Sequence, residues 1–321
     1  MVNLADIRNA RKTISDSLMA TPVFSASRIG AASGNIELFL KAESLQKTGS
    51  FKPRGALNLI RNTPADALGK GVITISAGNH AQGVAWAASA AGVDATIVMQ
   101  SSASPTKIAA TRGYGADVVL VDGTISEAFD ELHRLQQERN LTLIHPFDDP
   151  LLIAGHGTVG LEICEQVPDL DVIVCPIGGG GLISGIATAA KALKPEVRIY
   201  GIEPAGAAAM RKSWDQGSAA RLDSVDTIAD GLAPPMVGEL NYQITRELVD
   251  DVIVIDDTQI ATGLREILTS AKLYSEPAGA AATGALVAGV VPVRENETVV
   301  ALLSGANLDV SKLLDILGKL P

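Results

Sequence analysis

The stretch CPIGGGGLISG, residues 175–185, places four consecutive glycines between an apolar strand pattern and a helical pattern. Consecutive glycines allow several backbone N–H groups to converge on an anion, and the N-terminus of the following helix adds its positive end. The alternative is a flexible turn, but four glycines cost more backbone entropy than a simple turn requires. We therefore expect a phosphate group to bind at Gly178, Gly179, Gly180 and Gly181.

The glycines alone leave open which phosphate compound binds. Their spacing does not match G-x-G-x-x-G, yet Glu203 ends the next predicted strand, where a dinucleotide-binding fold carries its ribose-binding acid. A nicotinamide-dependent enzyme is therefore an alternative. No lysine of the P-loop type follows the glycines, which disfavours a nucleoside triphosphate.

The rest of the chain predicts an α/β fold around this junction. Short runs rich in β-branched residues alternate with alanine-rich helical patterns, which is typical of parallel sheets with helices on both faces. The segment FDDP at 147–150 separates the first four runs from the later ones. We predict two open, mostly parallel twisted sheets, in a large domain of residues 1–70 and 149–321 and a small domain of residues 71–148. The predicted strands are residues 71–76, 95–99, 116–121, 141–144, 171–177, 197–203, 251–256 and 298–304.

The composition excludes several kinds of partner. The chain has 26 basic and 36 acidic residues and a net charge of −10, so it lacks the basic surface that nucleic acid or an anionic membrane requires. No apolar run approaches the roughly 20 residues of a membrane span, and the first residues lack the apolar run of a signal peptide. The two cysteines, Cys164 and Cys175, lie in apolar segments, so we expect them to be buried free thiols. Free thiols are typical of a protein in a reducing compartment. We expect a cytoplasmic protein with no nucleic-acid or membrane partner.

A second strand-to-helix junction is ISAGNHAQG, residues 75–83. Ser76, Ala77, Gly78, Asn79 and His80 form another helix start whose N–H groups suit a carboxylate. Asn79 would either cap the helix or bind a ligand hydroxyl, and the sequence favours neither. For His80 a structural role is favoured over a catalytic one, and the same holds for the other histidines, which are His133, His145 and His156.

A third junction, ALLSGANLD at 301–309, ends a strand at Ser304. A serine hydroxyl at the end of a strand could bind a neutral ring nitrogen, or it could cap the next turn.

Lys52 has unusual neighbours for a lysine. It lies between Phe51 and Pro53, and the pattern predicts a helix that starts near residue 51 with Ser50 as its N-cap. A cation at the positive end of a helix is destabilised, and burial lowers its pKa further, which favours a free amine near neutral pH. Such an amine forms Schiff bases with carbonyl compounds. Lys47 lacks this setting, and we expect it in solvent.

Together these segments resemble the serine/threonine dehydratase and serine racemase family, which are pyridoxal-phosphate (PLP) enzymes of fold type II, like the tryptophan synthase β subunit. The resemblance covers essentially the whole chain, with seven motifs in the family's order. They are KTGSFKPRGA (47–56), SAGNHAQG (76–83), HPFDDPLLIAGHGT (145–158), PIGGGGLISG (176–185), TIADG (227–231), SEPAGA (275–280) and LLSGAN (302–307).

The resemblance implies a role for each candidate residue. Lys52 would form the Schiff base with PLP and move the Cα proton, with Phe51 against one face of the cofactor ring. The glycine loop, together with Leu182, would bind the phosphate of the cofactor. Asn79 would bind its ring hydroxyl, and Ser304 its ring nitrogen. The loop from Ser76 to His80 would bind the substrate carboxylate, and the small domain would close over the substrate.

Three positions depart from the family pattern. Racemases of the family carry a serine where this chain has Ala77, which cannot transfer a proton. A divalent cation (Mg²⁺, Mn²⁺ or Ca²⁺) would use Glu203 and the carbonyl of Ala207, but the usual aspartate is Ala209. His156 stands where glutamine is more usual.

The resemblance therefore implies PLP-dependent β-elimination from L-threonine or L-serine, giving a 2-oxo acid and ammonia. The alternatives are a 3-hydroxyaspartate dehydratase with the same chemistry and a serine or aspartate racemase. The sequence ends at Pro321, soon after LLSGAN, so we expect the short catabolic form without a regulatory domain, as a homodimer.

Overall fold

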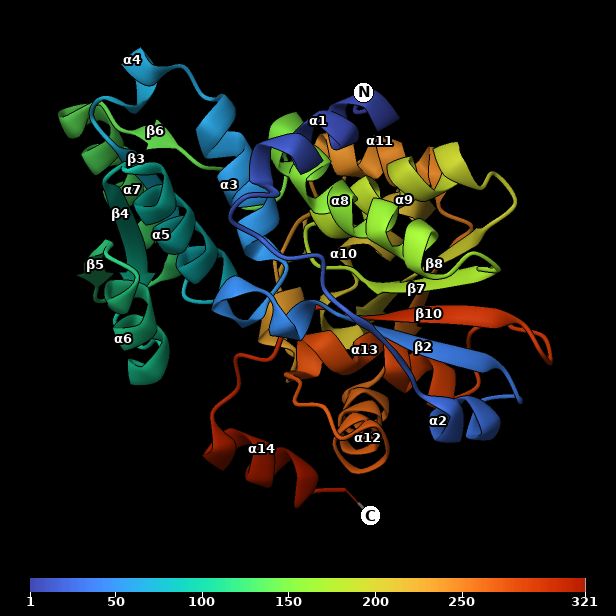
Figure 1. The fold of residues 1–321 in the computed structure, drawn as a ribbon. Coiled ribbons are helices and arrows are strands. Elements are labelled where there is room, and N and C mark those ends of the chain that lie inside the picture. The colour runs from blue at the N-terminus through green and yellow to red at the C-terminus, as the bar shows by residue number, and fades with distance from the viewer. Residues whose placement is uncertain (321) are drawn as a thin grey trace.

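The computed structural model describes residues 1–320 and contains two β-sheets, each in its own lobe (Figure 1). The large sheet has the order β1-β2-β10-β7-β8-β9 and the small sheet the order β5-β4-β3-β6. All neighbouring strands are parallel except β1 and β2. The large-sheet strands are β1 (Val23–Ser25), β2 (Glu37–Ala42), β7 (Val172–Pro176), β8 (Arg198–Pro204), β9 (Asp251–Ile255) and β10 (Thr298–Leu303), and those of the small sheet are β3 (Val72–Ile75), β4 (Ala95–Gln100), β5 (Asp117–Val121) and β6 (Thr142–Leu143).

The predicted pair of mostly parallel sheets is confirmed, with every predicted strand present. The strands β1 and β2 were not predicted. β2 has the sequence ELFLKA, which contains no β-branched residue and carries a charged residue near each end, so its strand signal is weak.

Helices cover both faces of each sheet. The α-helices are α1 (Leu4–Ile14), α2 (Ser27–Ala32), α3 (Lys52–Asn62), α4 (Ala65–Leu68), α5 (Asn79–Ala91), α6 (Pro105–Gly113), α7 (Ile125–Arg139), α8 (Pro150–Gln166), α9 (Gly181–Leu193), α10 (Ala209–Gln216), α11 (Glu239–Leu248), α12 (Asp257–Glu266), α13 (Pro277–Val287) and α14 (Val310–Leu317). Short 3-10 turns η1 (Glu43–Leu45), η2 (Lys47–Gly49), η3 (Ala205–Ala207) and η4 (Asp230–Leu232), and a π-helical turn η5 (Ile267–Ala271), complete the chain.

The strand β7 illustrates why its apolar run is continuous. Val172 and Val174 pack into a buried cluster with α12 and α13, whereas Ile173 and Cys175 pack with α8 and α9. Successive strand residues point to opposite faces, so a strand covered on both faces needs apolar residues throughout. Figure 1 shows α8 and α9 above this sheet and α12 and α13 below it.

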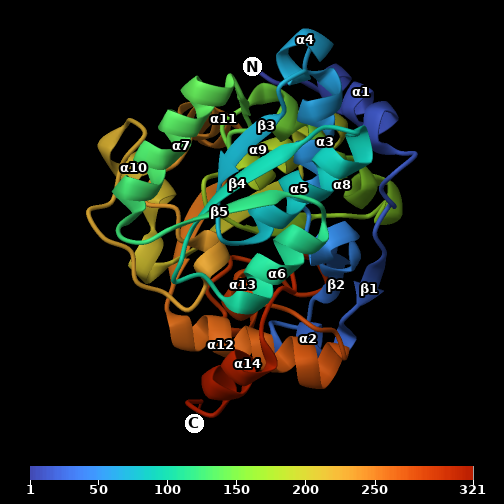
Figure 2. The same cartoon turned by 90° about the vertical axis from the view of Figure 1, so that its left-hand side faces the viewer.

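The small sheet is covered in the same way. Residues of α3 and α5 pack on one face and residues of α7 on the other. In Figure 2 the strands β3, β4 and β5 face the viewer, with α12 and α14 below them. Because α3 also packs on α8 of the large lobe, it lies where the two lobes meet. The predicted domain boundary at residue 70 stays a prediction.

A buried cluster of charges ties the start of α3 to the large lobe. Arg54 binds Glu43 (Nε to Oε2, 2.7 Å) and Glu162 (Nη1 to Oε1, 2.6 Å). Lys41 Nζ, fully buried, lies 2.6 Å from Glu162 Oε2. Two cations and two anions balance, and each accepts or donates several hydrogen bonds, as buried charges require. The cluster fixes the backbone two residues beyond Lys52.

No helix within residues 1–320 is long and apolar enough to cross a membrane.

Candidate active site

Lys52 is the first residue of α3, and Pro53 follows in the first turn, as the sequence predicts. Its Nζ donates to the carbonyl of Pro146 (3.0 Å) and lies 5.1 Å from the centre of the Phe51 ring. Burial lowers the pKa of the Lys52 amine from 10.5 to about 8. About one tenth of the amine is therefore unprotonated at pH 7, and about half at pH 8. Lys47 is exposed, as expected.

The predicted N-cap at Ser50 is wrong. The residue at the N-cap position is Phe51, and no side chain caps this helix. Ser50 is extended and pairs with Gly305 in an antiparallel bridge, so its backbone belongs to a sheet-like contact and not to a helix start. Phe51 N–H donates to the carbonyl of Ser304 (3.2 Å), which places the end of β10 beside Phe51 and Lys52.

The glycine loop has the features of an anion site. Gly178 to Gly180 connect β7 to α9, and Gly181 begins the helix. No acceptor for the backbone N–H groups of residues 178 to 183 is found in the described part of the chain, although most of these residues are buried. Buried N–H groups are almost always paired, so such a row fits a bound anion.

The loop also excludes larger residues. Gly180 has φ of +97°, a conformation that favours glycine. A Cβ on Gly179 would lie 2.2 Å from Cγ of Phe147, and one on Gly180 would lie 2.7 Å from Cβ of Asn241. The glycines are therefore required by close packing on the outer side of the loop.

The loop after β3 leads into α5, and α5 packs against Lys52. Gly83 of α5 packs directly on Lys52, since a Cβ there would lie 2.9 Å from the Lys52 Cβ. Within the loop, Ser76 Oγ accepts from Gly78 N–H (3.1 Å), so this N–H is not free for a ligand. The exposed Ala77 and the N–H groups of Asn79 and His80 at the helix start remain available for a carboxylate.

Asn79 has two partners that the sequence did not reveal. Its Oδ1 accepts from Asn307 Nδ2 (2.7 Å), and its Nδ2 donates to Glu276. Asn307 Nδ2 also donates to the carbonyl of Thr48 (2.7 Å). Burial raises the pKa of the Glu276 carboxyl to about 7. Both partners belong to recognised motifs, SEPAGA and LLSGAN, but motif spacing contains no information about which side chains meet.

His80, His145 and His156 surround the site and all have a pKa below the usual range because they are buried. Thr74 gives its hydroxyl hydrogen to the carbonyl of Ile144 (2.8 Å), so His80 Nε2 donates to Thr74 Oγ1 (3.0 Å). His145 Nδ1 accepts from two backbone N–H groups of its own turn. These contacts are structural, in line with the interpretation from the sequence.

His156 lies behind Phe51 and not in an open pocket. The two rings are in edge contact at 4.8 Å between centres. Neither ring nitrogen has a hydrogen-bond partner within residues 1–320. The ring packs between Gly55 of α3 and Gly181 at the start of α9.

Glu203, predicted as a metal ligand with Ala207, has a structural role. Its carboxylate oxygens accept from the N–H groups of Met210 and Arg211 (2.8 Å each) and so cap the start of α10. Burial raises the pKa of the Glu203 carboxyl to about 7. Among the described residues no three His, Cys, Asp or Glu side chains are grouped as a metal site requires. The metal site stays a prediction.

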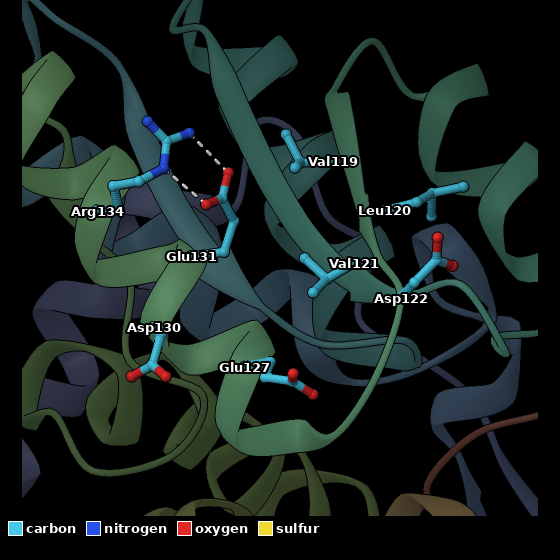
Figure 3. A pocket seen from close by; sticks show the side chains of 8 residues that line it. All are labelled: Val119, Leu120, Val121, Asp122, Glu127, Asp130, Glu131 and Arg134. Carbon is cyan, nitrogen blue, oxygen red and sulfur yellow. Dashed lines mark hydrogen bonds and ion pairs between the residues drawn. The ribbon is translucent and has the colours of Figure 1, made fainter.

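A surface hollow between β5 and α7 contains none of the candidate residues (Figure 3). It is lined by Val119, Leu120, Val121, Asp122, Glu127, Asp130, Glu131 and Arg134. Arg134 is paired with Glu131 (2.7 Å), so the remaining carboxylates make the hollow acidic and unsuited to a phosphate.

The comparison with known proteins decides which cofactor the chain uses. Residues 14–305 match the family model described as pyridoxal-phosphate dependent enzyme. The chain belongs to the pyridoxal-phosphate dependent enzymes. PLP is therefore the cofactor in place of the nicotinamide alternative, and the α/β fold expected from the resemblance is confirmed.

Relatives of this PLP-dependent enzyme include both lyases and racemases. It is 45% identical to the L-threonine ammonia-lyase of Geobacter sulfurreducens over 278 residues, which is 87% of this chain and 69% of the relative. Maize serine racemase has a similar structure (TM-score 0.93, 39% identity, 99% of this chain and 97% of that one). So has the processed threonine deaminase isoform 2 of Solanum lycopersicum (TM-score 0.92, 39% identity, 98% and 91%).

Proposed function

We propose that this PLP-dependent enzyme removes the β-hydroxyl group and the amino group of L-threonine or L-serine, giving a 2-oxo acid and ammonia. The observation that carries the proposal is Ala77, an exposed alanine in the loop that leads into α5, the helix whose Gly83 packs on Lys52. A racemase needs a second proton donor opposite its first base, and an alanine methyl group cannot be one. The L-threonine ammonia-lyase at 45% identity supports the same choice.

Different residues of the site would bind different parts of the cofactor. The N–H groups of the glycine loop and Leu182 would hold its phosphate, with Phe51 against its ring. Asn79 has a second Nδ2 hydrogen for the ring hydroxyl, because the first is directed to Glu276. Ser304 at the end of β10 lies beside Phe51 and would bind the ring nitrogen.

Lys52 performs the proton transfer. PLP, when bound, withdraws electrons from the Cα of an attached amino acid. The loop from Ser76 to His80 would hold the carboxylate, so that the Cα hydrogen points to Lys52 Nζ. The Lys52 amine, with its pKa of about 8, accepts this proton near neutral pH. Ala77, which the resemblance places opposite Lys52, cannot return a proton to Cα. The β-hydroxyl would therefore take up a proton and leave as water, and hydrolysis of the product would give the 2-oxo acid and ammonia.

Cofactor capture should depend on pH. Because the pKa of Lys52 is lowered to about 8, the reactive free amine increases as pH rises through this value. The rate at which cofactor-free protein takes up PLP should rise with a midpoint near 8 and then level off. Stopped-flow absorbance at several pH values measures it. A rate that keeps rising up to about pH 10, as for an exposed lysine, would contradict the lowered pKa.

Ala77→Ser should increase racemisation relative to elimination. The new hydroxyl can return a proton to Cα from the side opposite Lys52, and we expect the ratio of the two rates to rise about tenfold or more. Ala77→Gly is the matched control, since it changes the size of the side chain without adding a hydroxyl. The ratio is measured from 2-oxo acid formed and D-isomer formed, and an unchanged ratio for Ala77→Ser would count against the argument.

The substrate is tested by a screen of both enantiomers of threonine, serine and 3-hydroxyaspartate. We expect 2-oxo acid and ammonia from L-threonine or L-serine, with little change of configuration in the unreacted substrate. Turnover of 3-hydroxyaspartate alone would support the alternative dehydratase. Inversion without ammonia would support a racemase.

We also infer a homodimer, a closing small domain and a cytoplasmic location. The exposed apolar residues Met19, Phe24 and Leu45 lie at or near the edge strand β1 and support contact with a second copy. The loop from Ser76 to His80 belongs to residues 71–148, which supports closure of this domain over the substrate. Free Cys164 and Cys175 support a reducing compartment. Sedimentation gives the oligomeric state.

A further inference from the structure

Asn241 of α11 is a buried side chain with no role in the site as described so far. Its relative exposure is 0%, and Nδ2 donates to two carbonyl groups, those of Phe147 (2.9 Å) and Gly179 (3.0 Å). Two acceptors identify this amide atom as nitrogen and not oxygen. Oδ1 has no hydrogen-bond partner among the residues described. A leucine in this place would remove both hydrogen bonds together with the unpaired Oδ1.

The contact with Gly179 orients the peptide that follows it. The Gly179 carbonyl also accepts from Gly238 N–H (3.1 Å), so it is turned toward the start of α11 by two donors. In a trans peptide the N–H of the next residue points opposite to the carbonyl. The N–H of Gly180 therefore points away from α11, and it has no acceptor in the part of the chain described.

The contact with Phe147 connects the glycine loop to the residues around Lys52. The Phe147 ring packs on Gly179, and the preceding residue, Pro146, accepts the hydrogen bond from Lys52 Nζ (3.0 Å). One amide group thus holds both the loop and the segment that contacts Lys52. The sequence does not distinguish Asn241 from other polar residues of its helix.

We propose that Asn241 is a positioning residue that turns the Gly179–Gly180 peptide so that the Gly180 N–H binds the phosphate of the cofactor. The inference rests on the proposed assignment of the glycine loop to this phosphate. Without the amide, the Gly179 carbonyl keeps one donor only, and the flexible glycine peptide can rotate. The affinity for the phosphate end of the cofactor falls. The segment next to Lys52 stays in place, because the N–H groups of Phe147 and Asp148 still donate to His145 Nδ1 (3.3 and 2.8 Å), so contacts to the cofactor ring change little.

The test compares Asn241→Leu with Gln243→Leu. Gln243 lies on the same helix, is exposed, and donates only to Glu239 (3.3 Å), so the control makes the same kind of change away from the loop. Dissociation constants for PLP and for pyridoxal, which lacks the phosphate, are measured on cofactor-free protein prepared from the holoenzyme. For Asn241→Leu we expect a loss of PLP affinity of about tenfold or more, as for one hydrogen bond to a charged group. Pyridoxal affinity should change by less than about twofold.

A second readout separates positioning from general stability. Binding of PLP raises the unfolding temperature by an amount that depends on its affinity. For Asn241→Leu the difference between holoenzyme and cofactor-free protein should shrink, whereas a purely structural role lowers both temperatures equally. Asn241→Thr, which keeps one donor, should fall between wild type and Asn241→Leu, and it replaces the latter if that variant does not fold. Equal loss of PLP and pyridoxal affinity, or no loss, overturns the proposal. Wild-type protein that binds both equally well would instead contradict the phosphate assignment of the loop.

Discussion

Lys52→Ala protein is expected to purify without covalently bound PLP and to lose deamination of its substrate by at least about 1,000-fold. Removal of a general base alone reduces rates by about 100-fold to 10,000-fold, and in the proposed mechanism the same amine also attaches the cofactor. The expected loss is large because no described lysine other than Lys52 reaches Pro146 and Phe51. Absorbance in the visible range reports the cofactor, and release of 2-oxo acid reports activity.

Lys47→Ala is the control for this experiment. It removes an exposed lysine five positions earlier, in the same loop. Its absorbance and activity should match those of the wild type. A Lys52→Ala protein that keeps its visible band after denaturation and retains full activity would show that another amine holds the cofactor.

Glu162→Ala is expected to lower the free energy of unfolding by about 3–5 kcal/mol. Glu162 binds both Arg54 and Lys41 in the buried cluster, so its removal leaves an excess of positive charge out of contact with water. Lys41 is fully buried, and this burial lowers the pKa of its amine. Urea unfolding followed by circular dichroism measures the change. Because Arg54 lies two residues beyond Lys52, the variant should also hold less PLP.

Glu138→Ala is the matched control. It also breaks a glutamate–arginine pair, with Arg134, but this pair lies on the exposed side of α7. Water and salt screen such a pair, so the unfolding free energy should change little. A Glu162→Ala protein as stable as this control would mean that the buried cluster contributes no net stability.

The sequence predicted the parts of this protein whose signals are local. The four glycines lie between a strand and a helix as expected, and Lys52 begins a helix with Pro53 in its first turn. Continuous apolar strands predicted parallel sheets with two covered faces, because a strand that is buried on both faces is apolar at every position. The family resemblance then supplied PLP, which the glycines alone did not.

The parts that escaped prediction depend on contacts between distant segments. Ser50 has the composition of an N-cap, but pairing with Gly305, 255 positions later, makes it extended. Asn79 is held by Glu276 and Asn307, and the glycine loop by Asn241, from other elements. Glu203 accepts two backbone N–H groups at the start of α10, which the sequence did not reveal. In each case the residue and its partner are far apart in the sequence or lie on different elements, and they meet only in the folded chain.

The close packing of Gly83 on Lys52 bears on how the two lobes can move. A Cβ on Gly83 would lie 3.1 Å from the carbonyl carbon of Lys52, so α5 and the start of α3 pack closely there, and a rotation of α5 would pivot about this contact. Asn79 lies four residues away along the helix, a lever arm of about 6 Å. A rotation of about 10° would then shift the loop from Ser76 to His80 by about 1 Å while leaving the amine almost stationary. In the proposed mechanism, such a rotation adjusts the position of the substrate carboxylate at the scale that decides reactive alignment, while the proposed base, Lys52, keeps its place.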